Sequence, residues 1–202
     1  MKRLALSIAI VLALGAALLL SLLVVRRDGG QVVSQGAAAQ GVSAFAEDEL
    51  KAAEELSMAA LRGDGDLVPR IREWAGTNVA RKIWACDIVR NAKRTDALAA
   101  LARDALDACR GGGATYGRLF RTAKFLEECR DWTAARAALD LAAPLAKYRT
   151  HREDVAFARL RIDIAAEGAT ADRLDELRRI SASAAMNDNR LAAARLLKSY
   201  ER

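Results

Sequence analysis

The stretch from Leu4 to Val25 contains 22 consecutive uncharged, mostly aliphatic residues. At about 1.5 Å per residue, a helix of this length spans a hydrocarbon core of roughly 30 Å. The alternative is a cleaved secretory signal, whose apolar stretch has only about 7 to 15 residues and is followed closely by a small-x-small site. Cleavage after Gly15 would leave residues 16–25 as an apolar N-terminus, and Ala44-Phe45-Ala46 lies far beyond the stretch. We therefore expect residues 1–27 to be an uncleaved transmembrane anchor, with residues 4–25 in the membrane.

Basic residues flank the apolar stretch on both sides: Lys2 and Arg3 precede it, and Arg26 and Arg27 follow it. An excess of positive charge usually marks the cytoplasmic side of a transmembrane helix, and here the two sides carry nearly equal positive charge. A very short N-terminal tail of this kind is typical of a bacterial signal anchor, in which the tail stays in the cytoplasm and the rest is exported. We expect a single-pass protein of the inner (cytoplasmic) membrane with a periplasmic or otherwise extracytoplasmic C-terminal domain.

The charge balance bears on the class of partner. The chain carries 32 Lys and Arg against 26 Asp and Glu. Four of the basic residues lie within residues 1–27, which hold no acidic residue, so the remainder has 28 basic and 26 acidic side chains. Nucleic-acid-binding domains usually concentrate a large basic excess on one face. The near-neutral remainder therefore argues against nucleic acid as a partner.

The sequence offers few residues for catalysis or metal binding. A metal site would need its single His and scattered Cys to converge from distant positions. We interpret His151 as a solvated histidine of a basic interhelical loop, because no nucleophile and base lie beside it in the pattern that catalysis requires. The glycines at 111–113 lack the Lys-Ser/Thr pair of a phosphate-binding loop. We expect no enzyme activity, no metal, no cofactor, and three free, mostly buried thiols at Cys86, Cys109 and Cys129.

Beyond the apolar stretch, the chain divides into a linker and a helical domain. Residues 28–44 are small and polar without a sustained period, which predicts a flexible linker. Residues 45–202 show apolar residues at helical spacing and no strand-like alternation, which predicts an all-α domain. Ser43 is the expected N-cap of its first helix, and short connections make each helix antiparallel to the next. The predicted helices span residues 44–62, 67–75, 79–93, 96–109, 115–129, 132–147, 152–167, 171–185 and 189–201.

The segment from Tyr116 to Ala142 carries large and small apolar residues at regular positions. They are Leu119, Ala123, Leu126, Trp132, Ala135, Leu139 and Ala142. The alanines at 123 and 135 would let two helices approach closely, to about 8 to 9 Å. This pattern, with the stretch LEECRDWTAARAALDLA, resembles the tetratricopeptide repeat. The resemblance implies antiparallel helix pairs stacked as a short solenoid; the alternative is a compact helical bundle.

The resemblance also implies where a partner binds, because in tetratricopeptide-like proteins the first helix of each pair lines the inner face. The residues expected there are Phe120, Arg121, Lys124, Arg152, Val155 and Arg159. Their apolar and basic character favours an acidic or mixed peptide, and an ordinary solvated helix face is the alternative.

Together these features predict a membrane-anchored scaffold or adaptor outside the cytoplasm. It would bind another protein, expected to be a membrane or envelope protein, and assist the assembly or stability of an envelope complex. The alternatives are a small integral subunit of a membrane complex, or a soluble exported helical protein after signal cleavage.

Overall fold

The computed structural model describes the backbone of residues 39–200 and the side chains of residues 47–200. The predicted anchor (1–27) and most of the predicted linker (28–44) lie outside the described residues. Among the helices of residues 39–200, none has the length and apolar character that crossing a membrane requires. The chain from Glu47 onward forms one compact unit.

Residues 39–200 are all-α, as predicted, with nine α-helices, one short 3-10 helix and no strand. Most helix ends lie within three residues of their predicted positions. The helices are α2 (Ala39–Arg62), α3 (Leu67–Ala75), α4 (Val79–Asn91), α5 (Thr95–Gly111), α6 (Tyr116–Glu128), α7 (Trp132–Ala142), η1 (Ala143–Leu145), α8 (Arg149–Glu167), α9 (Ala171–Ser183) and α10 (Asn187–Tyr200).

Two helix ends differ clearly from the prediction. The first helix begins at Ala39, inside the predicted linker, so Ser43 lies within the helix and is not its cap. The alanines of this stretch favour helix more than any other residue type. At the other end, α7 stops at Ala142 and continues as the 3-10 helix that contains Pro144. Proline lacks the backbone N–H that a longer α-helix would need and clashes with the preceding turn.

One type of tight turn joins α2 to α3, α4 to α5 and α6 to α7. In each turn one residue has a left-handed backbone, with φ of 79°, 59° and 59° at Gly63, Lys93 and Arg130. The next amide donates to a carbonyl five residues earlier, at 3.1, 2.9 and 2.9 Å for Asp64, Arg94 and Asp131. This is the Schellman arrangement, which satisfies carbonyls at a helix end. Its recurrence makes the three helix pairs structurally alike, so the fold is helical-repeat-like.

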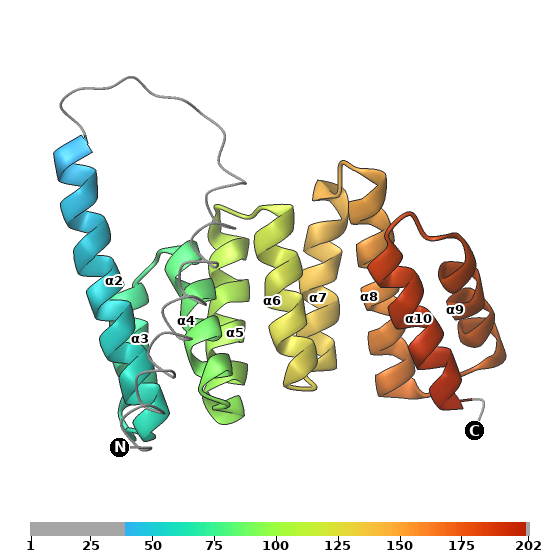
Figure 1. Cartoon of the computed structure of the whole chain (residues 1–202), viewed down its shortest axis with the longest axis horizontal. Coiled ribbons are helices and arrows are strands. Elements are labelled where there is room, and N and C mark those ends of the chain that lie inside the picture. Colours follow the sequence, from blue (N-terminus) through green and yellow to red (C-terminus); the bar gives the residue numbers. More distant parts are fainter. Residues whose placement is uncertain (1–38, 201–202) are drawn as a thin grey trace, which may run out of the picture. The chain divides into compact units, whose positions relative to one another are not determined.

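The helices from α3 to α8 follow one another side by side (Figure 1), and their contacts arrange them in two layers. Each helix contacts its successor in the chain, and α4, α6 and α8 also contact one another in that order. In the same way, α3 contacts α5 and α5 contacts α7, so these three helices form the second layer. A layer of first helices therefore lies against a layer of second helices.

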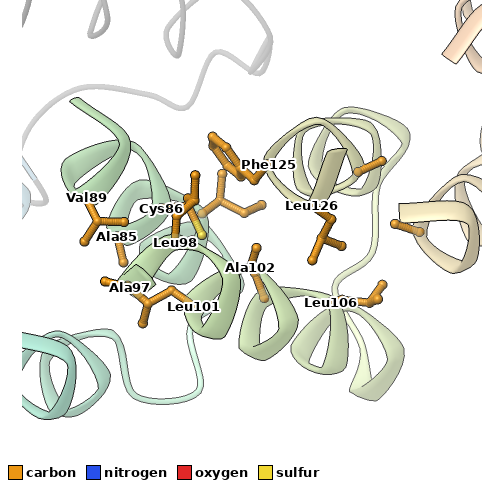
Figure 2. Packing of buried hydrophobic residues seen from close by; sticks show 14 of the residues in the cluster. Ala85, Cys86, Val89, Ala97, Leu98, Leu101, Ala102, Leu106, Phe125 and Leu126 are labelled. Carbon is orange, nitrogen blue, oxygen red and sulfur yellow. The ribbon is translucent and has the colours of Figure 1, made fainter. Parts of the chain in front are cut away.

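The main hydrophobic core runs from α2 to α8 and is rich in alanine. Figure 2 shows part of it, where side chains of α4, α5 and α6 meet. Fully buried alanines such as Ala85, Ala102 and Ala135 let neighbouring helices approach closely, while Phe125 and Leu126 of α6 supply bulk.

A second, separate core joins α8, α9 and α10. The helix α8 contributes to both cores from different faces. Its residues Val155, Ala158 and Ile162 belong to the main core. Phe157, Leu160 and Ile164 belong to the second core. This helix is therefore covered on two sides.

Candidate functional site

A row of ion pairs ties the first helices to one another. Its arginines are spaced by 40 residues, and each binds a carboxylate on the preceding first helix. The pairs are Arg81 with Glu49, Arg121 with Asp87, and Arg161 with Glu127. Regular cross-links of this kind fix the helices that carry the candidate binding face.

Arg121, one of the predicted partner-binding residues, is the central member of this row. Its guanidinium binds Asp87, which is only 9% exposed and lies 3.1 Å from a second guanidinium, that of Arg90. The two guanidinium carbons also lie 5.3 and 6.0 Å from the ring centroid of the buried Phe125. Arg121 is therefore committed to holding α4 and α6 together, and less of its charge is available to a partner.

Beside this clamp, a line of stacked rings runs across α6 and α8. The Tyr116 ring lies between the rings of Phe120 and His151, with centroid distances of 5.5 and 3.9 Å and interplanar angles of 15° and 9°. The Tyr148 ring meets His151 edge-on at 5.0 Å. At the opposite end, the Lys124 ammonium lies 4.8 Å from the Phe120 centroid. We call these five residues the aromatic row.

Hydrogen bonds to the carboxylate of Asp154 hold the aromatic row in place. The Tyr116 hydroxyl donates to Asp154 of α8 at 3.2 Å, and the amide nitrogen of Asn189 in α10 donates to the other oxygen of Asp154 at 2.8 Å. Burial, together with the nearby Asp154 carboxylate, raises the pKa of the Tyr116 hydroxyl, which therefore stays protonated and can donate. One carboxylate thus links three helices beneath the row.

Exposure differs along the aromatic row. Tyr148 is 67% exposed, the largest value among the large apolar and aromatic side chains of residues 47–200. Phe120, Tyr116 and His151 are half-buried, and Lys124 is exposed. The row therefore presents partly exposed ring surface and the exposed side chain of Lys124, with the hydrogen bonds to Asp154 beneath.

The structure brings together only some of the six residues predicted to bind a partner. Phe120, Arg121 and Lys124 lie on the exposed side of α6, and Arg152 lies near the start of α8, where it donates to the Lys147 carbonyl at 3.1 Å. Arg159, in contrast, binds Asp140 of α7, which lies in the other layer. Val155 is only 5% exposed and lies in the main core. Val155 is therefore closed to a partner, and the charge of Arg159 is largely balanced by Asp140, because α8 packs against α7 and the main core on this side.

The residues of the repeat pattern lie inside the fold. Trp132 is half-buried and packs against the main core. The other six are at most 2% exposed: Leu119, Ala123, Leu126, Ala135, Leu139 and Ala142.

Three members of the aromatic row were not among the predicted site residues. His151 was expected in a loop, but α8 begins at Arg149, so His151 lies in its first turn and stacks on Tyr116. Its Nδ1 atom is buried without a hydrogen-bond partner among residues 47–200. The spacing of Tyr116, Phe120 and Lys124, each four residues apart, was the available signal that they share one helix face. No sequence pattern indicated that Tyr148 and His151 would pack against these residues of α6.

Other reactive groups do not form a site. In the part of the chain that the structure describes, no three His, Cys, Asp or Glu side chains gather as metal ligands would. The three cysteines are free; Cys86 and Cys109 are buried and Cys129 is half-buried. Burial raises the pKa of all three thiols, which lowers their reactivity.

Comparison with protein-family models, with curated proteins and with solved structures finds no match for this chain.

Proposed function

We propose that this protein is a membrane-anchored, extracytoplasmic adaptor that binds another protein through its helical repeats and supports the assembly or stability of an envelope complex. The membrane part of the proposal rests on the 22 uncharged residues from Leu4 to Val25. The repeat part, including the likeness to tetratricopeptide repeats, is supported by the recurrent Schellman turn and the two layers of helices.

The aromatic row is the observation that carries the proposed binding role. Aromatic residues make up only 5% of the chain, yet Tyr116 stacks on both Phe120 and the single histidine, and Tyr148 meets that histidine edge-on. Aromatic side chains supply large contact area and dominate many binding interfaces. Because stacking and the Asp154 hydrogen bonds already fix the rings, a partner loses little side-chain entropy on binding them.

The charged side chains near the aromatic row indicate what kind of partner segment binds there. Lys124 makes no ion pair among residues 47–200, and Arg152 makes none either. Two available cations beside exposed rings favour a peptide that carries an apolar side chain next to a carboxylate. In this arrangement Phe120 is the apolar anchor, and Lys124 mainly steers association and sets selectivity.

The test is capture of the partner by the full-length protein from solubilised membranes, with chemical crosslinking and mass spectrometry. Phe120→Ala should reduce capture by about tenfold or more, as expected for an anchor residue. Lys124→Glu should also reduce capture, with a larger loss at low salt than at 0.5 M salt, because exposed charges are screened over about 10 Å at 0.1 M salt.

Two changes elsewhere serve as matched controls. Leu141→Ala removes an apolar side chain of 38% exposure from α7, and Lys93→Glu reverses an exposed charge in the α4–α5 turn. Both should leave capture unchanged, and all four variants should keep the helical circular-dichroism signal. If Phe120→Ala captures the partner as well as the native protein does, the aromatic row is not the binding site.

A further inference from the structure

The two terminal helices of the described unit leave apolar side chains uncovered. Met58 and Leu61 of α2 are 49% and 57% exposed, and Leu191 of α10 is 48% exposed. They are the first and the last α-helix of residues 39–200. End helices of repeat arrays usually have a polar outer face, because nothing stacks on them. The apolar residues at both ends are therefore unusual for a protein whose ends stay in water.

On α2, these apolar residues share a stripe with acidic side chains. Glu54, Glu55 and Met58 follow one another at helical spacing, and Leu61 continues the stripe. Neither glutamate makes an ion pair with any residue from 47 to 200. A shallow, open hollow lies along this stripe, lined by Lys51, Glu54, Glu55, Met58, Arg62 and Arg70.

The two arginines of this hollow are already neutralised. Arg62 and Arg70 lie 3.2 and 3.5 Å from the same carboxylate oxygen of Asp64, and Arg70 also lies 3.6 Å from the carboxylate of Asp66. Their charge is therefore largely balanced within the turn that follows α2. The uncompensated charge along the stripe comes from two glutamates against one lysine, so the α2 end is acidic.

On α10, the corresponding stripe is basic. Leu191, Arg195 and Lys198 recur at intervals of four and three residues, and Ala194 lies between them on the same side. All four are exposed. Within the described residues, neither Arg195 nor Lys198 has an ion-pair partner. The exposed Asp188 lies one turn before Leu191, so the α10 stripe has one acidic group before the leucine and two basic groups after it. An apolar residue with two basic groups on one side thus complements the two apolar residues of α2, which have two acidic groups on one side.

We propose that the α10 end of one copy of this protein docks on the α2 end of another copy. Leu191 would pack against Met58 and Leu61, with Arg195 and Lys198 facing Glu54 and Glu55. The symmetric alternatives are disfavoured, because α2 against α2 brings glutamates together and α10 against α10 brings cations together. A head-to-tail contact is heterologous, so it leaves one free end of each kind and permits chains longer than two copies.

This inference goes beyond the proposed function and does not depend on it. The aromatic row consists of residues of α6, the start of α8 and the residue before it, and none of them belongs to either stripe. Head-to-tail docking through the stripes therefore does not use the row. A row of copies would then present the same binding face repeatedly, which raises the effective affinity for a partner with several matching segments.

The test uses full-length protein in detergent with the photocrosslinking residue p-benzoylphenylalanine at position 58. Two preparations with different affinity tags are mixed, irradiated and digested, and the crosslinked peptides are identified by mass spectrometry. We expect crosslinks between copies from position 58 to peptides of α10. Glu54→Lys with Glu55→Lys should reduce their yield at least tenfold, and so should Arg195→Glu with Lys198→Glu.

Charge restoration separates docking from simple damage to the fold. Mixing the two double variants should restore crosslinks from position 58 of the Glu54→Lys/Glu55→Lys chain to α10 of the other variant. A single chain with all four reversals should crosslink to itself as the native protein does. Lys93→Glu, which reverses an exposed charge in the α4–α5 turn, should not change the yield. Phe120→Ala tests partner binding separately, so the two proposals can fail independently. The proposal would be overturned by crosslinks from position 58 to α2 of the second copy or by the absence of crosslinks to α10. It would also be overturned if mixing the two double variants did not restore the crosslinks.

Discussion

Replacement of Ala135 by leucine tests how closely α6 and α7 pack. Ala135, Ala138 and Ala142 of α7 are all 0% exposed. Leucine adds three carbons, and burying them would stabilise the fold by about 0.8 kcal/mol each if there were room. At a fully buried helix contact there is none, so neighbouring side chains or the helix must move, at a cost of about 1 to 3 kcal/mol. In a domain of this size, 1 kcal/mol changes the Tm by about 2 to 4 °C.

We therefore expect Ala135→Leu to lower the Tm by about 2 to 12 °C, measured by circular dichroism at 222 nm. Ala156→Leu is the matched control, because Ala156 is exposed in the long helix α8. Alanine and leucine have similar helix propensities, so this control should melt close to the native protein. Equal melting temperatures for the two variants would show that α6 and α7 are not packed closely at Ala135.

Two further predictions concern titratable groups. Burial and the Asp154 carboxylate raise the pKa of Tyr116 above the ordinary value of about 10, so the unfolded chain loses this proton first and stability should fall as pH rises above about 10. Asp154→Asn removes one cause of the shift and should make the total loss of stability smaller, as measured by urea unfolding at several pH values. Burial, and next the Asp87 carboxylate, raises the pKa of the Cys86 thiol. Iodoacetamide at pH 8 should therefore alkylate Cys129 well before Cys86, and mass spectrometry that shows Cys86 labelled first would contradict this expectation.

Most of the fold of residues 39–200 was predictable from local patterns. Helical spacing of apolar residues and turn-forming residues placed the helices, and these are short-range signals. The clear misses occur where two local signals compete. Alanine-rich residues extended α2 backwards over Ser43, and Pro144 ended α7 earlier than its apolar pattern suggested.

The candidate site was less predictable, because it depends on contacts between helices. Phe120 and Lys124 could be placed on one face of α6 from their spacing. That Tyr116 stacks on His151 of another helix depends on where α8 begins and how it packs. Likewise, the arginines at 81, 121 and 161 share a visible spacing, but only the structure shows that each binds a carboxylate on the preceding first helix.

The double burial of α8 has a consequence for how the chain is made. Synthesis proceeds from the N-terminus, so the segments of the main core, which ends in α8, are complete before α9 and α10 have been made. At that stage Phe157, Leu160 and Ile164 are still exposed, because α9 and α10 do not yet cover them. A chain interrupted there would combine a folded domain with an open apolar edge, the kind of surface that promotes aggregation. The helices α9 and α10 thus protect the complete chain from aggregation through this apolar face of α8.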